Sequence, residues 1–382
     1  MVEVNARAAQ MGVPLSVQLD VTYRCNERCV HCYLDHDDHG EMTLPEIKAL
    51  LDQLAAAGVL FLTLSGGEVM MRTDFFDIVE YARSLQFCVK VKTNAFMVSE
   101  QHADRLRELG VNEVQISIYS HRAEVHDRIT KLPGSLKRSL AGIRFLKSRG
   151  LKVIVANVLM TPNLGDYEQV RALARQLGAQ ATIDPTITPM MDGNRSTLDL
   201  GISSDDLRTV FHNSDLVGPV EQFCAPPSPN KNESDLDALP CSAGHSACYI
   251  SPYGDGYPCV QFPLPCGNVR RQKFSDIWRE SPQLKEVRSI RARNLPSCSQ
   301  CTHLGTCTRC PGLAYMEGSM YGPSILDCEK SFARTGIPSE NWNAKKSSLL
   351  PLVQIQAAQS SGLPSVRGSY SKSRTHGTAL DI

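Results

Sequence analysis

Three cysteines near the start of the chain have the spacing of a metal site. Cys25, Cys29 and Cys32 follow an apolar run and are separated by three residues and then by two. Closed zinc and iron sites usually have four ligands, whereas a catalytic metal site keeps one coordination position open. Three thiolates can hold a four-iron, four-sulfur cluster through three of its irons, which leaves the fourth iron free for another ligand. The triad therefore predicts an open iron–sulfur site.

A zinc knuckle is the alternative for these three cysteines. His31, His36 or His39 would then provide the fourth ligand. Zinc sites more often use paired CxxC units, and the longer first interval of this triad is unusual for them. We therefore favour the iron–sulfur interpretation.

The other cysteines are also distributed as metal ligands rather than as disulfide partners. The 382-residue chain contains 14 cysteines, of which Cys88 stands alone in the long middle and ten lie from Cys224 onward. In a reducing compartment such cysteines bind metals more often than they pair. Two cysteine-rich regions that flank a nearly cysteine-free one indicate two metal-binding regions, and Cys88 fits a small buried apolar residue.

The overall composition is that of an ordinary globular protein. Apolar residues make up 42% of the chain, and 40 basic residues balance 40 acidic ones, so no net field favours nucleic acid or an anionic membrane. The start of the chain lacks the pattern of a signal peptide, and no run approaches the roughly 18 apolar residues of a spanning helix. We expect a cytoplasmic protein with no nucleic-acid or membrane partner.

Short apolar runs alternate with helical patterns from about residue 14 to residue 190. Six strands and the helices between them predict parallel strands joined by right-handed crossovers. The fold class is therefore α/β, with a partial six-stranded relative of the (β/α) barrel, followed by a small cysteine-rich domain. The expected strands are 15–22, 60–66, 88–93, 113–119, 152–160 and 180–187.

Polar motifs follow the first four of these strands. The cysteine triad follows the first, "SGGE" (65–68) ends the second, "TNA" (93–95) ends the third, and "SIYS" (117–120) ends the fourth. In barrels of this kind the chemistry gathers at the carboxyl ends of the strands. Motifs that are scattered in sequence are therefore expected on one rim.

This combination resembles the radical S-adenosylmethionine (SAM) superfamily. The resemblance implies that the methionine amine and carboxylate of SAM chelate the open iron of a cluster held by the triad. It assigns contacts with SAM to six further residues: His31, Gly66, Gly67, Glu68, Asn94 and Ser117. The "GGE" segment matches the part that holds the methionine amino group, Asn94 and Ser117 match positions near the ribose and carboxylate, and His31 lies near the adenine.

Two positions depart from the pattern of the superfamily. Val69 stands where proline is usual, and Ala95 stands where glycine is commoner. Each short motif also has a structural interpretation, because "GGE" can be a simple turn, Asn94 can cap a helix and Ser117 can be a hydrogen-bonded hydroxyl. Their expected position on a shared rim favours the functional interpretation.

The second cysteine-rich region resembles the SPASM extension of radical SAM enzymes that mature peptides and proteins, such as those of the pyrroloquinoline quinone and mycofactocin pathways. The resemblance rests on Cys241, on Gly254 with four residues between it and Cys259, and on a later cysteine group. It implies two auxiliary four-iron clusters, and so three [4Fe-4S] clusters in all. The implied ligands are Cys241, Cys248, Cys259 and Cys310 for the first and Cys298, Cys301, Cys307 and Cys328 for the second.

Two assignments within this region leave alternatives. Cys248 is the expected fourth ligand of the first auxiliary cluster, while Cys266 is either spare or a substitute. The interval from Cys307 to Cys310 is one residue shorter than the commonest form, which weakens the assignment of Cys310. A pair of structural zinc ribbons is the alternative for the whole region.

The expected domains follow from these motifs. They are an N-terminal extension (1–14), the radical SAM partial barrel (15–200), a linker or insert (201–240), the SPASM domain (241–335) and a C-terminal tail (336–382). The part of the tail after about residue 356 has little apolar content, so the tail is predicted to be partly disordered.

The resemblance implies an oxidoreductase that cleaves SAM reductively and uses the 5′-deoxyadenosyl radical. The leading hypothesis is oxidative modification of a ribosomally made peptide through a carbon–carbon, thioether or similar crosslink. The alternatives are a protein side-chain oxidase similar to anaerobic sulfatase maturases and an enzyme that modifies a tetrapyrrole or other small molecule. A non-catalytic metal-binding protein is a further hypothesis, which the open triad and "SGGE" disfavour.

The same hypothesis predicts three kinds of partner. These are a peptide or protein substrate, an electron donor such as flavodoxin or ferredoxin, and a separate leader-peptide-binding protein. The last is expected because the first strand begins near residue 15, which leaves no room for the leader-binding domain that many peptide maturases carry before the barrel. The barrel and the extension could also bind the leader themselves.

Overall fold

A computed structural model describes residues 2–34, 36, 38–228 and 236–345. The greater part of the expected C-terminal tail, residues 346–382, lies outside the described residues. Within the described part of the chain, no helix combines the length and the apolar character needed to cross a membrane.

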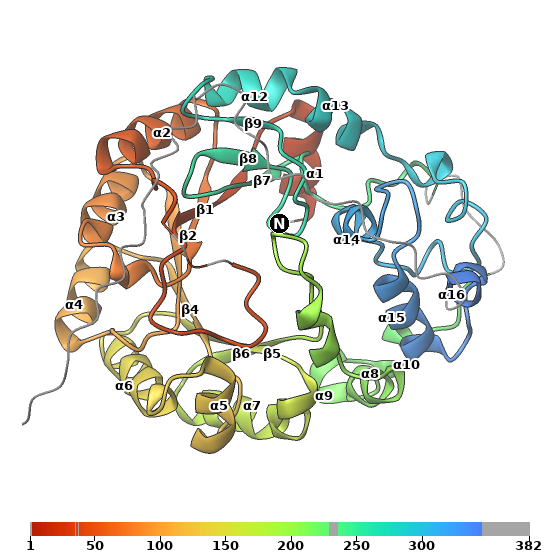
Figure 1. Ribbon diagram of the computed structural model, residues 1–382, viewed down its shortest axis with the longest axis horizontal. Helices are drawn as coiled ribbons and strands as arrows, with labels where there is room; N and C mark the ends of the chain where they lie inside the picture. The colour runs from red at the N-terminus through yellow and green to blue at the C-terminus, as the bar shows by residue number, and fades with distance from the viewer. Residues whose placement is uncertain (1, 35, 37, 229–235, 346–382) are drawn as a thin grey trace, which may run out of the picture.

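The six expected strands form a parallel sheet in sequence order (Figure 1). They are β1 (Ser16–Thr22), β2 (Phe61–Gly66), β3 (Cys88–Thr93), β4 (Glu113–Ser117), β5 (Val153–Val158) and β6 (Gln180–Asp184). Buried and partly exposed residues alternate along β3 and β5, as expected of strands with one face on a core. The expected α/β fold with a parallel partial barrel is confirmed, although β4, β5 and β6 end two or three residues earlier than predicted.

Helices between the strands cover the outer face of the sheet (Figure 1). They are α2 (Leu44–Ala56), α3 (Phe75–Ser84), α4 (Glu100–Glu108), α5 (Ala123–Thr130), α6 (Ser135–Ser148) and α7 (Tyr167–Gln176). Local sequence fixes where they begin: Thr43 and Glu46 form a capping box at α2, and Ser99 accepts a hydrogen bond from the backbone of His102 at α4. A further helix, α1 (Val2–Met11), precedes β1.

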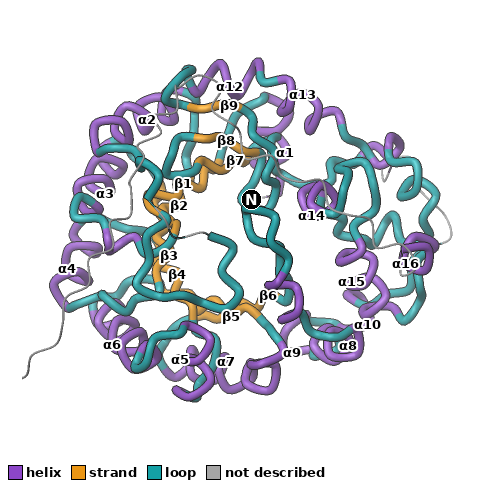
Figure 2. The backbone as a smooth tube through the Cα atoms, in the orientation of Figure 1, coloured by secondary structure: helices purple, strands orange, loops and turns teal. Residues whose placement is uncertain are grey.

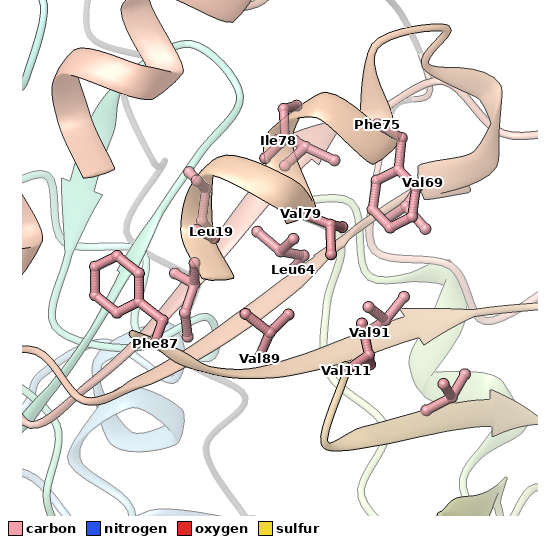
Figure 3. Packing of buried hydrophobic residues seen from close by; sticks show 14 of the residues in the cluster. Leu19, Leu64, Val69, Phe75, Ile78, Val79, Phe87, Val89, Val91 and Val111 are labelled. Atoms are coloured by element: carbon pink, nitrogen blue, oxygen red, sulfur yellow. The ribbon is translucent and has the colours of Figure 1, made fainter. Parts of the chain in front are cut away.

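The main core lies between the strands and these helices. Figure 3 shows Ile78 and Val79 of α3 beside Leu64 of β2 and Val89 of β3, all fully buried. Each such side chain contributes about 1.5–3 kcal/mol when it leaves water. The barrel thus has its own core, which holds the carboxyl ends of the strands in place.

The cysteine-rich region continues this sheet beyond β1 (Figure 2). β7 (Ala247–Ile250) pairs in parallel with β1, and β8 (Asp255–Tyr257) and β9 (Gly267–Asn268) follow as antiparallel strands. We did not predict these strands, because two to four residues are too few to show a pattern. The second region is therefore joined to the barrel by backbone hydrogen bonds.

Short helices joined by loops make up the remaining C-terminal part. They are α8 (Ser204–Phe211), α9 (Ser214–Val217), α10 (Val220–Phe223), α12 (Phe274–Glu280), α13 (Pro282–Ser289), α14 (Pro311–Met316), α15 (Ile325–Thr335) and α16 (Glu340–Lys345). The range 201–240, which we interpreted as a linker or insert, thus contains three short helices between residues 204 and 223. Leu207 and Val210 of α8 share a small core with Ala333 of α15, so this part is a packed insert.

Candidate active site

The strand-end motifs meet around one cavity, which we call the chamber. The chamber has a volume of about 340 Å³ and is bounded by the carboxyl ends of β1 to β6. Of the predicted site residues outside the cysteine-rich region, it is lined by Cys25, Cys29, His31, Cys32, Gly66, Gly67, Asn94 and Ser117. The structure therefore brings the scattered motifs together, and Glu68 is the one predicted residue of this group that does not line the chamber.

The cysteine triad lies on the loop between β1 and α2. All three cysteines are half-buried free thiols. Burial raises the pKa of Cys25 to about 12, and the charge of Cys32 adds to the shift. Burial also raises the pKa of Cys29, and the charges of Glu27, Cys32 and Cys25 add to that shift. The three thiols are thus close enough to oppose one another's ionisation, so three thiolates here need a cation beside them.

The two glycines after β2 pack tightly against the start of this loop. Gly66 has a φ of +131°, which favours glycine, and a β-carbon there would lie 2.0 Å from the carbonyl oxygen of Thr22. A β-carbon on Gly67 would lie 2.3 Å from the carbonyl oxygen of Arg24. The glycines therefore position the cysteine loop, and their contact with SAM stays a prediction.

Glu68 is fully buried and braces the ends of β2 and β3. Its carboxylate accepts hydrogen bonds from the Thr93 hydroxyl at 2.7 and 2.8 Å. It also accepts from the backbone amide of Asn94 at 2.8 Å and from the backbone amide of Met70 at 3.0 Å. Burial raises the pKa of Glu68, while these bonds partly oppose the shift. The structure thus gives Glu68 an internal role, and its pairing with the methionine ammonium stays a prediction.

Asn94 is held where it faces the triad. Its side-chain nitrogen Nδ2 donates to Asn26 Oδ1 at 2.8 Å, and its side-chain oxygen Oδ1 accepts from the backbone amide of Phe96 at 2.9 Å. The next residue, Ala95, has a φ of +58°, a left-handed conformation that favours glycine. This conformation explains why glycine would be the easier residue at a position where this chain carries alanine.

His31 and Ser117 both line the chamber. Burial lowers the pKa of His31 to about 4, so its ring is neutral. The ring stands edge-on to Tyr119 at a centroid distance of 4.7 Å, and its Nδ1 atom has no hydrogen-bond partner among the described residues. A neutral, flat ring with an unpaired nitrogen fits the predicted position near an adenine, which stays a prediction.

Sequence reasoning missed several buried polar residues of the chamber. Glu27 lies between Cys25 and Cys29, its Oε1 atom has no partner among the described residues, and burial raises its pKa to about 7. Lys92 donates to Gln18 Oε1 at 2.9 Å, and both line the chamber. Strand alternation could have indicated Gln18 and Lys92, because their buried neighbours face the other side of the sheet.

The first group of auxiliary cysteines is partly assembled. Burial raises the pKa of Cys241 to about 11, and the charges of Cys310 and Cys259 add to the shift, so these three thiols lie near one another. Cys248, on β7, lines a small apolar cavity together with Cys266. The charge of Cys266 acts on Cys248 more strongly than that of Cys259. The structure thus places Cys248 beside Cys266, and the identity of the fourth ligand of the first auxiliary cluster stays a prediction.

The second group surrounds a cavity of its own. This cavity has a volume of about 140 Å³, and its lining includes Cys298, Cys301, Cys307 and Cys328. Burial raises the pKa of Cys328 to about 12, and the charges of Cys307, Cys298 and Cys301 add to the shift. The four cysteines that the resemblance groups together therefore line one cavity.

The donor sets suit iron–sulfur clusters. All fourteen cysteines are free thiols, and soft thiolates are the usual ligands of such clusters. Unpaired buried atoms of His31 and Glu27 lie in the same chamber as the triad, which provides polar contacts for a cofactor. Within the described part of the chain, no group of three or more Cys, His, Asp or Glu side chains is placed to hold a single metal ion.

Two family models match the chain. The radical SAM superfamily model matches residues 19–177, which begin within β1 and contain β2 to β5 and the triad. The model of the SPASM iron–sulfur cluster-binding domain matches residues 241–302, which contain β7 to β9 and the six cysteines from Cys241 to Cys301. The matched regions are those in which the sequence indicated metal ligands.

Individual relatives have related names. The AdoMet-dependent heme synthase of Oleidesulfovibrio alaskensis is 28% identical over 78% of this chain and 83% of its own length. The mycofactocin maturase MftC of Mycobacterium tuberculosis is 27% identical over 78% of each chain. Among solved structures, Streptococcus suis SuiB bound to the precursor peptide SuiA is similar with a TM-score of 0.66 and 17% identity, over 84% of this chain and 78% of SuiB, and shows the same fold.

These findings agree with the geometry of the chamber. The matched domains carry a SAM-binding [4Fe–4S] cluster and auxiliary clusters, which are the groups that the two cysteine-rich regions suit. The chain is therefore an enzyme of the radical SAM superfamily with a C-terminal SPASM domain.

Proposed function

We propose that the enzyme oxidatively modifies a ribosomally made peptide, forming a carbon–carbon, thioether or similar crosslink. The mycofactocin maturases are named for peptide maturation and are relatives over most of this chain. The observation that carries the proposal is the wall of the chamber that faces the SAM-site residues. That wall comes from residues 186–191 after β6 and from the SPASM domain, and most of it is apolar or uncharged.

The charges of the chamber favour a peptide segment over a tetrapyrrole. Apart from histidines, its charged lining side chains are Lys92, Glu27 and Asp184, one cation against two carboxyl groups. A tetrapyrrole of the haem type carries several carboxylates and needs excess positive charge for binding. The relationship to heme synthases keeps a tetrapyrrole substrate as the second candidate, together with a protein side chain of the kind that sulfatase maturases oxidise.

Each group of cysteines would hold a different cluster. Cys25, Cys29 and Cys32 would hold the SAM-binding cluster, and the two auxiliary cysteine groups would hold the other clusters, with Cys248 or Cys266 as the unassigned ligand. When bound, these clusters supply one-electron chemistry, which cleaves SAM and accepts an electron at the end of the reaction. The cytoplasmic electron donor would be a flavodoxin or ferredoxin, and a separate protein would bind the leader peptide.

The chamber's own groups position the reactants and exclude water. Asn94 and Ser117 would hold the ribose and carboxylate of SAM, and the neutral ring of His31 would lie near its adenine. A crosslink forms when two hydrogen atoms leave the peptide, one to the 5′-deoxyadenosyl radical and the other as a proton and an electron. Glu27, which is buried and has one unpaired oxygen in the chamber, would take up that proton.

The experiment uses the peptides encoded beside the gene. The anaerobically reconstituted enzyme is incubated with SAM, a strong chemical reductant and each short peptide, and the products are analysed by mass spectrometry. Loss of hydrogen from a peptide with matching release of 5′-deoxyadenosine would support the proposal. Reaction with a carboxylated tetrapyrrole, with no change in any peptide, would establish the second candidate instead.

A further inference from the structure

A second cavity adjoins the chamber, and we call it the side cavity. It has a volume of about 240 Å³ and lies between the segment that follows β6 and helices α14 and α15. Both cavities are lined by Thr186, Ile187, Pro189 and Met316. The chamber and the side cavity are therefore neighbours on either side of the same few side chains.

The two facing walls of the side cavity present apolar surface. Leu198 and Ile202 come from the segment between β6 and α8, and Leu313, Ile325 and Leu326 come from α14 and α15. Leu198, Ile325 and Leu326 are only half-buried, so part of each side chain is open to a ligand. Apolar walls of this kind are typical of a site that binds a ligand by burial of its side chains.

The charged residues of the side cavity hold its walls. Lys330 donates to the Thr186 hydroxyl at 2.9 Å and lies 3.5 Å from Asp327. Glu329 accepts from the Ser204 hydroxyl at 2.5 Å. Two cations and two anions in the lining balance each other, namely Arg195, Lys330, Glu317 and Glu329. The site therefore suits an uncharged apolar segment better than a polyanion.

We propose that the side cavity binds the residues of the peptide substrate that flank the modified residue. The extended peptide would run between the segment after β6 and helices α14 and α15, and enter the chamber beside Ile187 and Met316. This inference rests on the proposed function and adds to it a substrate class: a linear peptide with at least one apolar side chain within a few residues of the modified one. The SPASM domain then binds substrate in addition to holding clusters.

The test fills the side cavity with a larger side chain, introduced on one wall or on the other. Leu198→Trp and Ile325→Trp enlarge partly exposed side chains on opposite walls, and Ile337→Trp is the control, because Ile337 is 40% exposed and lines neither cavity. The probes are the synthetic form of the peptide that the wild-type enzyme modifies and a five-residue fragment centred on the modified residue. The measured quantity is the ratio of kcat/KM for the full peptide to kcat/KM for the fragment.

The proposal predicts a ratio of about ten or more for the wild-type enzyme, the change that about 1.4 kcal/mol of additional binding produces. Both tryptophan variants should bring the ratio close to one, and the Ile337→Trp control should keep the wild-type ratio. A ratio near one in the wild type, or an unchanged ratio in either wall variant, would overturn the proposal. Iron content verifies folding, and Leu198→Phe and Ile325→Phe replace any variant that loses iron.

Failure of the proposed function gives a different result. In that case the wild-type enzyme modifies no peptide at all, whereas failure of the side-cavity proposal leaves peptide modification intact and changes only the ratio.

Discussion

Replacement of Glu68 with glutamine tests whether this carboxylate braces the strand ends or binds SAM. Glu68 Oε1 accepts from the Met70 amide at 3.0 Å, and Oε2 accepts from the Asn94 amide at 2.8 Å. The Thr93 hydroxyl lies within hydrogen-bond distance of both oxygens. A glutamine keeps the shape of the side chain but replaces one of these acceptors with an NH₂ group.

The size of the effect follows from this geometry. Whichever way the amide is turned, its NH₂ group faces the amide N–H of Met70 or of Asn94, so one buried donor loses its acceptor. An unsatisfied buried donor costs about 1–3 kcal/mol. Burial raises the pKa of Glu68, so the neutral amide regains some desolvation energy. We therefore expect Glu68→Gln to lower the free energy of unfolding by about 2 kcal/mol.

The assay separates stability from cofactor binding. Urea denaturation of the apo-protein, followed by far-UV circular dichroism, measures the free energy of unfolding, and hydrogen exchange should show faster exchange in residues 93–96. Equilibrium dialysis of the reconstituted enzyme measures SAM affinity. Glu108→Gln is the control. Glu108 is 66% exposed, and its ion pair with Arg105, at 3.5 Å, lies on the surface, where such pairs contribute little. This substitution should therefore change the free energy of unfolding by less than about 0.5 kcal/mol.

The two roles of Glu68 give opposite results. If Glu68 braces the strands, stability falls and exchange rises near Asn94. If Glu68 instead pairs with the methionine ammonium, stability stays within about 0.5 kcal/mol of the wild type while SAM binding weakens by about 1.5–3 kcal/mol. The second outcome would refute the bracing role that we infer from the hydrogen bonds.

Three further predictions concern the metal sites and the barrel interior. Replacement of Cys25, Cys29 and Cys32 with alanine should abolish SAM cleavage and lower the iron content from about twelve to about eight per chain; complete loss of iron would contradict separate metal regions. Cys328→Ala should leave measurable SAM cleavage by a strong chemical reductant but reduce peptide modification much further, and equal losses would argue against an electron path through the extension. Burial raises the pKa of Asp20 to about 6 from 3.8, so the folded state holds a proton that the unfolded chain releases between these values. Wild-type stability, measured by urea denaturation, should therefore fall as the pH rises from about 4 to 6, by up to about 3 kcal/mol relative to Asp20→Asn, and parallel pH profiles of the two proteins would contradict it.

The barrel could be predicted from sequence because its signals are local. Each of the six strands carries its own apolar run, and capping residues such as Thr43 and Ser99 mark where helices begin. The shared rim followed from a general property of parallel α/β folds and needed no knowledge of distances. The strands of the SPASM domain gave no such signal, because β9 has two residues and its existence depends on pairing with β8.

The same contrast between local signals and tertiary packing applies to the site residues. The resemblance to SPASM domains groups Cys298, Cys301, Cys307 and Cys328, and the structure places all four around one cavity. The bracing role of Glu68 could not be predicted, because two of its donors, Thr93 and Asn94, lie at and just after the end of β3, and because its burial depends on tertiary packing. The position of Cys248 beside Cys266 likewise depends on how the strands of the hairpin face the helices, which the spacing of cysteines does not contain.

The pairing of β7 with β1 has a consequence for the enzyme as a whole. β1 leads directly into the cysteine loop, and without β7 it would be an open edge strand with unpaired backbone groups. Side chains strengthen the junction, because the Tyr249 hydroxyl lies 2.6 Å from that of Tyr23 and donates to Asp20 at 2.9 Å. Tyr23 is two residues before Cys25, so the SPASM domain is anchored to the element that positions the triad. A SPASM domain fixed in this way can hold its auxiliary sites and its wall of the chamber in constant relation to the SAM site, which an electron path and a shared substrate site both require.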